Sequence, residues 1–149
     1  MSDNWITLIP TDPNLQPTAE SAERARTLLT SFVPRAQEIE LEFTDNPQFI
    51  GPCGNWEGVA CPACGANAEP WWSDAVGRAY VTGFTDLSVT APCCNARLSL
   101  NDLNYIPPAG FARFVLSAQN PYVEDLSPPQ MQQLETCLGC RLRRIWAHI

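Results

Sequence analysis

The feature that most constrains this chain is a pair of cysteine-bearing turns that lie 30 residues apart. The first reads CPACG over residues 61–65, and the second reads APCCN over residues 91–95. In this alignment the two prolines coincide and Cys94 lies over Cys64. An asparagine lies over the glycine, and both residue types tolerate a positive φ. The match predicts two copies of one turn.

Two thiolates in such a turn converge on one point, and structural zinc takes four sulfur or nitrogen ligands in a tetrahedron. The second turn has alanine at the first ligand position, so the next candidate is Cys93, which precedes Cys94 directly. Neighbouring residues of a strand point in opposite directions, so both bind one ion only if the turn interrupts that alternation. We predict a structural Zn²⁺ held by Cys61, Cys64, Cys93 and Cys94. The competitors for the fourth position are Cys53, Cys137, Cys140 and His148.

Two other interpretations of the thiols are a redox dithiol and simple burial. A thioredoxin-type pair begins a helix, whereas Gly65 and the turn-like segment ANAEP oppose a helix after Cys64. Cys137 and Cys140 form a second CxxC, but a glycine lies between them and a predicted helix ends there, so we expect core thiols. The single histidine, His148, has no serine or carboxylate partner nearby in the sequence. We therefore expect a strand residue there and predict no catalytic residue.

The N-terminal segment predicts a strand, a helix and a second strand. Residues 5–10, WITLIP, form a short β-rich run. Thr18 is a good N-cap, and the apolar residues that follow it have helical spacing until Pro34. Residues 38–43, EIELEF, alternate strictly between glutamate and apolar side chains, which is typical of a half-buried strand.

The same order of elements returns at the other end of the chain. Residues 110–121 have the content of a strand, with a short helix over 111–118 as the alternative. Ser127 and Gln130 predict a capping box, and Gly139 predicts the end of that helix. Residues 141–149 are then a last strand. We predict an α+β fold with a split-βαβ (ferredoxin-like) sheet, formed by residues 1–50 and 109–149. Residues 51–108 form a zinc-ribbon-like insertion within one domain.

Charge and composition limit the classes of function. The formal net charge is −7, and residues 1–60 alone hold nine carboxylates against three arginines. Such a charge opposes binding to nucleic acid, unless Arg141, Arg143 and Arg144 form a local basic strip. The chain contains no lysine, which excludes a phosphate-binding P-loop and a lysine Schiff base. It also has no apolar run of the roughly 20 residues that a membrane helix requires. We expect no contact with membranes, and a cytoplasmic location because the polar N-terminus does not resemble a secretory signal.

Two further groups of side chains are candidates for partner binding. Glu38, Glu40 and Glu42 share one face of a predicted strand, where they form either a solvated surface or a contact for a basic protein. Trp71 and Trp72 either line a groove or cover the metal turns and connect them to the sheet.

Several segments together resemble a group of small uncharacterised bacterial proteins that carry them in the same order. These segments are NWITLIP, CPACG, EPWW, TAPCCNARLSLNDLNY and GFARFVLSAQNP. The resemblance spans most of the chain and implies that Cys61, Cys64, Cys93 and Cys94 act as one set. The second turn of that group usually ends in glycine, so Asn95 departs from its pattern. Members have been labelled sugar-transporter ATPases, which the missing P-loop contradicts here.

Three classes of function remain. The first is a zinc-stabilised acidic module that binds a basic protein, as an immunity or antitoxin protein or a regulatory adaptor does. The second is a zinc-ribbon protein that binds nucleic acid. The third is a small metalloenzyme, which needs an open coordination position and a nearby general base. Because four thiolates leave no open position, we expect the first class.

Overall fold

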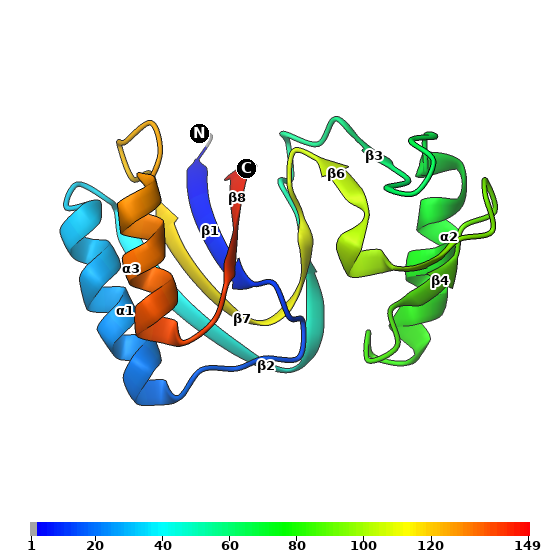
Figure 1. Ribbon diagram of the computed structural model, residues 1–149. Coiled ribbons are helices and arrows are strands. Elements are labelled where there is room, and N and C mark those ends of the chain that lie inside the picture. The colour runs from blue at the N-terminus through cyan, green and yellow to red at the C-terminus, as the bar shows by residue number, and fades with distance from the viewer. Residues whose placement is uncertain (1–2) are drawn as a thin grey trace.

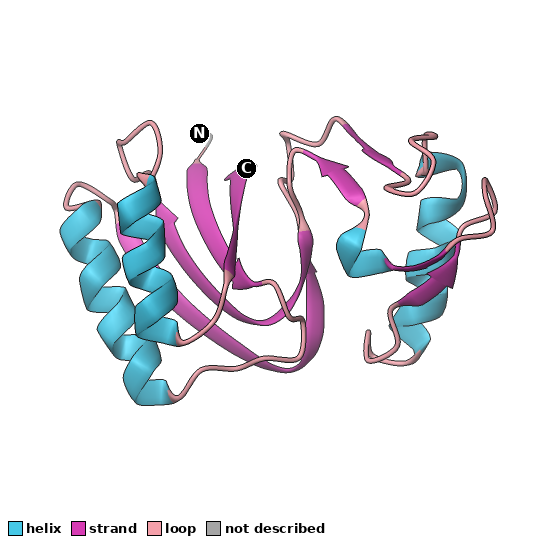
Figure 2. Ribbon diagram, viewed as in Figure 1, coloured by secondary structure: helices cyan, strands magenta, loops and turns pink. Residues whose placement is uncertain are grey.

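A four-stranded antiparallel sheet forms the larger part of the computed structural model, which describes residues 3–149. The strand order is β2-β7-β1-β8. These strands are β1 (Asn4–Pro10), β2 (Glu38–Ile50), β7 (Gly110–Gln119) and β8 (Leu142–His148). Helices α1 (Ala19–Phe32) and α3 (Pro128–Leu138) lie side by side on one face of the sheet (Figures 1 and 2). The chain is therefore a mixed α+β protein.

The helix signals of the sequence are present in the structure. The Thr18 hydroxyl accepts a hydrogen bond from the Ser21 N–H at 3.1 Å, so α1 begins with a side-chain cap. Ser127 and Gln130 form the reciprocal capping box at the start of α3. Gly139 ends α3 in the left-handed conformation, with φ +73°. Local side-chain chemistry therefore determines both ends of α3 and the start of α1.

The first hydrophobic core lies between the two helices and the sheet. Its central strand β1 contributes Ile6 and Leu8, whose side chains are fully buried. Ile6 is opposite Ala118 of β7 on one side and Trp146 of β8 on the other. The other buried members come from the two helices, β7 and β8 and their flanking loops: Ala22, Ala25, Leu29, Val33, Phe114, Leu116, Ala118, Leu126, Leu134, Leu138 and Leu142.

Strand β2 is longer than the sequence pattern indicated. The prediction covered residues 38–43, whereas the strand continues to Ile50 after a shift of register between Phe43 and Gln48. The first half keeps its alternation, so Ile39 packs partly against the first core. Glu38, Glu40 and Glu42 are exposed, as the alternation predicts.

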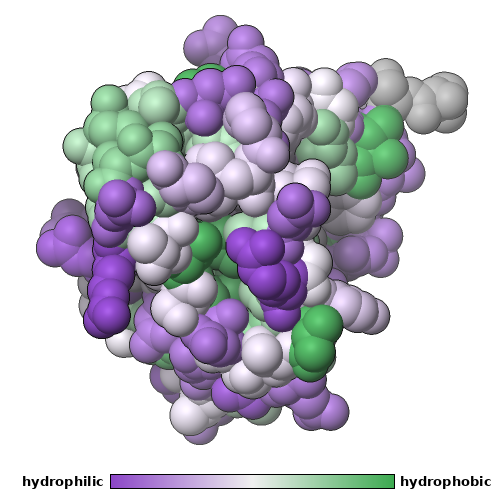
Figure 3. All heavy atoms as spheres, turned by 90° about the vertical axis from the view of Figure 1, so that its right-hand side faces the viewer, coloured by the Kyte–Doolittle hydropathy of each residue, from purple (hydrophilic) through white to green (hydrophobic). Residues whose placement is uncertain are grey.

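Residues between β2 and β7 form a second group of short elements, which lies apart from α1 and α3 (Figures 1 and 2). Two small antiparallel pairs occur there, β3 with β6 and β4 with β5. The elements are β3 (Gly58–Ala60), α2 (Glu69–Val81), β4 (Ser88–Thr90), β5 (Arg97–Ser99), the 3₁₀ turn η1 (Leu100–Asp102) and β6 (Asn104–Ile106). Viewed from this side, the surface is largely hydrophilic, with apolar side chains in separate patches (Figure 3).

An aromatic core joins this second group of elements to the sheet. The Phe49 ring of β2 lies 5.4 Å from that of Trp72 in α2 and 5.2 Å from that of Phe111 in β7. The Trp72 indole donates to the Tyr105 hydroxyl at 3.0 Å, and that hydroxyl donates to the Leu100 carbonyl at 2.6 Å. Burial raises the pKa of Tyr105 to about 12, which keeps the hydroxyl protonated as a donor. Trp72 therefore connects the insertion to the sheet, one of its two predicted roles.

A buried asparagine makes a second connection. The Asn101 side chain donates to the Thr11 carbonyl at 2.9 Å and accepts from the Phe111 N–H at 2.8 Å. Arg143 of β8 donates to the carbonyls of Asn101 and Ala109, both at 2.8 Å. One polar centre thus joins η1 to strands β7 and β8 and to the segment after β1.

Strand β7 and helix α2 correct two local interpretations of the sequence. The alternative of a helix over residues 111–118 is wrong, because the whole segment lies in β7 and pairs on both sides. Helix α2 was not expected, because ANAEP was interpreted as a turn. The helix begins at Glu69 without a side-chain cap on Ala68; Pro70 lies in its first turn, and the Asn67 side chain accepts from the Glu69 N–H at 3.1 Å. Within residues 3–149, no helix is both long and apolar enough to cross a membrane.

Candidate metal centre

The first cysteine turn directly follows β3. The Cys61 N–H donates to the Ala66 carbonyl at 2.8 Å, and the Gly65 N–H donates to the Cys61 carbonyl at 2.8 Å. Gly65 has φ +79°, a conformation that favours glycine. These bonds close the turn and leave the two thiols, Cys61 and Cys64, on the same side as the second turn.

The second turn repeats the same bonds 30 residues later. The Ala91 N–H donates to the Ala96 carbonyl at 2.9 Å, and the Asn95 N–H donates to the Ala91 carbonyl at 2.7 Å. Asn95 has φ +62°, so it takes the conformation of the glycine that it replaces. The alignment of the two turns in the sequence is therefore also their alignment in space.

Four thiols meet between these turns. The Sγ atoms of Cys61, Cys64, Cys93 and Cys94 all lie within 4.8 Å of one another. Cys61 and Cys94 are separated by 3.8 Å between sulfurs, and Cys64 and Cys93 by 3.4 Å. A tetrahedral zinc site with Zn–S bonds of about 2.3 Å requires sulfurs about 3.8 Å apart. The cluster therefore has the size and the donor atoms of a four-thiolate metal site.

Cys93 and Cys94 both reach the cluster because neither lies in a strand. They occupy the turn between β4 and β5, so the alternation of strand side chains does not apply. In the repeat, Cys93 corresponds to Ala63, and the buried Ala91 corresponds to the buried candidate ligand Cys61. The second turn therefore supplies its other sulfur from a position two residues further on. Cys93 is exposed, as are Cys64 and Cys94, whereas Cys61 is buried.

The competing candidates for the fourth ligand lie outside the cluster. His148 is engaged at Nδ1 by the Asn4 side chain at 2.8 Å, at the end of β8. The Cys137 thiol donates to the Ser21 carbonyl at 3.8 Å, and Cys140 packs against the first core with it. Cys53 is exposed and its thiol points to the Gly51 carbonyl, 3.9 Å away. The thiols of the second CxxC are thus partly buried core groups, as predicted.

The backbone and the neighbouring thiols shift the acidities in the cluster. Backbone N–H groups, chiefly that of Cys64, lower the pKa of Cys61 to about 7. The hydrogen bond with Cys64 raises the pKa of Cys93 to about 12. The N–H of Ala96 favours the Cys94 thiolate, but desolvation and the neighbouring thiols outweigh it, so the pKa of Cys94 is raised. A cation at the centre would replace the protons that these thiols share, since metals bind the thiolate.

The sequence pattern predicts the four sulfurs but not the groups that support them. Ala91 is fully buried at the unused ligand position, and the alanines at 66 and 96 close the two turns through their carbonyls. The repeat extends to these alanines in the sequence, so comparing the turns over six residues would have found them.

Comparison of the chain with protein-family models, with curated proteins and with solved structures finds no match.

Removing one central thiol is expected to release the metal and destabilise the chain. In Cys64→Ser, metal analysis of protein purified without added zinc should fall from about one equivalent to almost none. The free energy of unfolding should fall by about 4 kcal/mol or more, because metal loss is among the most costly single changes. Cys137→Ala is the matched control and should keep its metal. Metal-free wild-type protein with an unchanged melting temperature would contradict the assignment.

The unusual position of Cys93 allows a second test of the metal site. Cys93→Ala should lower zinc affinity at least about tenfold, since losing a ligand costs more than losing a group that hydrogen-bonds to a ligand. Adding Ala91→Cys to that variant should restore affinity, because position 91 corresponds to the ligand position of Cys61. Competition with a chromophoric chelator measures the zinc affinities of the single and the double variant. If the double variant binds as weakly as Cys93→Ala, the two turns are not equivalent around the metal.

Proposed function

We propose that this chain is a zinc-stabilised, acidic protein-binding module, as an immunity or antitoxin protein or a regulatory adaptor is, and that it performs no catalysis. The observation that carries the proposal is the cluster of four thiols within 4.8 Å. Four sulfurs fill every position of a tetrahedral zinc ion, so neither water nor substrate can bind the metal. A small metalloenzyme, which needs that open position, is correspondingly less well supported.

We also propose that the larger sheet has the split-βαβ, ferredoxin-like topology, with residues 51–108 as a zinc-ribbon-like insertion. Support comes from the strand order β2-β7-β1-β8, with α1 between β1 and β2 and α3 between β7 and β8. The two turns with their short strands β3, β4 and β5 support the comparison with a zinc ribbon. The motifs that resemble those of the small bacterial proteins are compatible with the same arrangement of thiols.

The proposed partner is a basic protein. Glu38, Glu40 and Glu42 are exposed on β2, which lies at the edge of the sheet. Their cross-strand neighbours on β7 are Gln119, Ser117 and Val115, so no arginine is directly opposite any of them. Three such carboxylates give this edge a negative field, which accelerates encounter with a basic surface. A cytoplasmic location is part of the proposal, because its reducing conditions keep thiols available to metal.

Nucleic-acid binding is the alternative, and the arginines near the C-terminus give it little support. Arg143 donates to two backbone carbonyls, and Arg144 pairs with Asp125 at 3.0 Å. The two are consecutive in β8, so their side chains leave opposite faces of the sheet. This arrangement does not favour the continuous basic strip that phosphate binding would need.

Replacing Glu38, Glu40 and Glu42 together by glutamine should weaken capture of a basic protein from host extract. The variant should fold normally, because all three side chains are exposed. Wild-type binding should also weaken with salt, since the Debye length falls from about 30 Å at 0.01 M to about 3 Å at 1 M. Quantified pull-downs at several salt concentrations measure both effects.

Glu57→Gln/Asp74→Asn/Asp102→Asn is the matched control, since it removes three exposed carboxylates away from β2 and should bind like the wild type. Salt-independent capture would contradict the electrostatic proposal. Salt-sensitive capture of DNA or RNA instead of protein would favour the alternative.

A further inference from the structure

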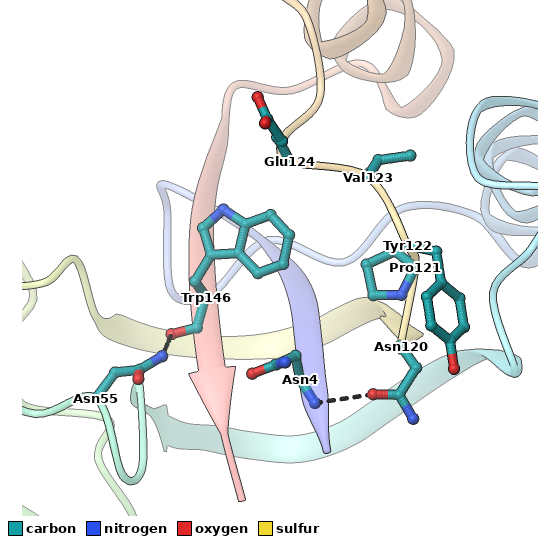
Figure 4. A pocket seen from close by; sticks show the side chains of 8 residues that line it. All are labelled: Asn4, Asn55, Asn120, Pro121, Tyr122, Val123, Glu124 and Trp146. Atoms are coloured by element: carbon teal, nitrogen blue, oxygen red, sulfur yellow. Dashed lines mark hydrogen bonds between the residues drawn. The ribbon is translucent and has the colours of Figure 1, made fainter. Parts of the chain in front are cut away.

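A hollow of about 650 Å³ opens where β1 begins and β8 ends (Figure 4). It lies outside the cysteine cluster and shares no residue with it. Its wall combines three asparagine amides, two aromatic side chains, a proline, a valine and one carboxylate. A volume of this size with a few polar groups on an apolar wall is typical of a ligand site.

Trp146 forms the floor of this hollow. Its side chain projects from β8 on the helix side of the sheet, and it packs partly against the first core while remaining half-exposed. Figure 4 shows the indole between Asn4 of β1 and the segment that carries Val123 and Glu124. Residues from three distant parts of the chain thus surround one flat aromatic surface.

The opposite wall is held by a dense set of contacts. The Asn120 side chain accepts from the Asn4 N–H at 3.0 Å and donates to Asp3 at 2.9 Å and to Gln37 at 3.0 Å. Asn120 and Tyr122 both have positive φ, at 46° and 56°. Residues with such backbone conformations persist where the surroundings fix them, and they gather at ligand sites. The hollow is therefore formed before any ligand enters.

Several polar groups of the hollow keep unused hydrogen-bonding capacity. The Asn55 amide donates to the Trp146 carbonyl at 3.2 Å, which leaves its own oxygen as an acceptor. The contact of Asn4 Oδ1 with His148 leaves the Asn4 amide group as a donor. Within residues 3–149, neither a hydrogen bond nor an ion pair engages the Glu124 carboxylate.

The charge of the hollow indicates the kind of ligand. Among the described residues that line the hollow, Glu124 is the only one with a charged side chain, so its carboxylate favours a cationic ligand over an anionic one. Tryptophan offers the best aromatic face for a cation. The chain also has one such contact nearby, because the Arg35 guanidinium lies 5.3 Å from the centre of the Tyr122 ring.

We propose that this hollow receives an arginine side chain from the basic partner. A planar guanidinium can stack on Trp146 while its N–H groups donate to the exposed Glu124 carboxylate in the same wall. Lysine fits less well, because its compact ammonium neither stacks nor donates in a planar fork. The identity of the partner rests on the proposed function, whereas the recognition of arginine depends on this hollow alone.

The test uses a small probe, so it does not require the partner. Metal-loaded, ¹⁵N-labelled protein is titrated with N-acetyl-arginine amide at low salt, and the indole N–H resonances are followed. The Trp146 resonance, identified by its absence in Trp146→Phe, should shift and saturate. Glu124→Gln should weaken binding at least about fivefold, as expected for loss of one charge-assisted contact. Asp74→Asn, which removes an exposed carboxylate on α2, should leave affinity unchanged.

Three results would overturn the inference: no saturable shift, an equal response to N-acetyl-glutamine amide, or unchanged affinity in Glu124→Gln. The two proposals fail in different ways. If the probe binds but host extract contains no basic partner, the hollow recognises arginine and the proposed function is wrong. In the opposite case, a basic partner binds Glu124→Gln as tightly as it binds the wild type but does not bind the triple glutamine variant. The proposed function is then supported, and the hollow is not the site that receives an arginine of the partner.

Discussion

Convergence of four sulfurs between two turns is the interaction on which the insertion depends most. Strands β3, β4, β5 and β6 have three residues each and form only two-stranded pairs. Pairs of this length are not stable alone, so something else must hold them in place. In the cluster, sulfur atoms from both pairs lie 3.4 to 3.8 Å apart across the two turns. A zinc ion bound to all four would replace these weak contacts with bonds.

A series of contacts connects the candidate metal centre to the sheet. The Ala68 N–H donates to the Val59 carbonyl at 2.9 Å, which connects the start of α2 to the strand before the first turn. From α2, Trp72 contacts Phe49 of β2 and bonds to Tyr105 of β6. The buried residues of this second core and of the core under α1 and α3 are different sets. Metal loss should therefore disturb the aromatic core first and the two helices last.

The parts of this structure that the sequence predicted are those governed by local rules. Thr18, Ser127 and Gly139 mark helix ends through contacts within a few residues, and the alternation of residues 38–43 defines a strand face. Helix α2 was missed because Ala68 provides no side-chain cap and Gly77, inside the helix, is a residue of low helix propensity. The alternation of side chains in a strand left the fourth ligand undecided in the sequence, because that alternation does not hold inside a turn. The hollow could not be predicted from the sequence, since Asn4, Glu124 and Trp146 come together only in the tertiary fold.

Zinc K-edge X-ray absorption of protein purified without added metal tests the central claim most directly, because it identifies the atoms bound to the ion. The account predicts four sulfur scatterers at about 2.3 Å and no nitrogen or oxygen in the first shell. A first shell with three or fewer sulfurs, completed by oxygen or nitrogen, would contradict it. Such a shell would mean that at least one of the four thiols does not bind the metal and that the site can take another ligand.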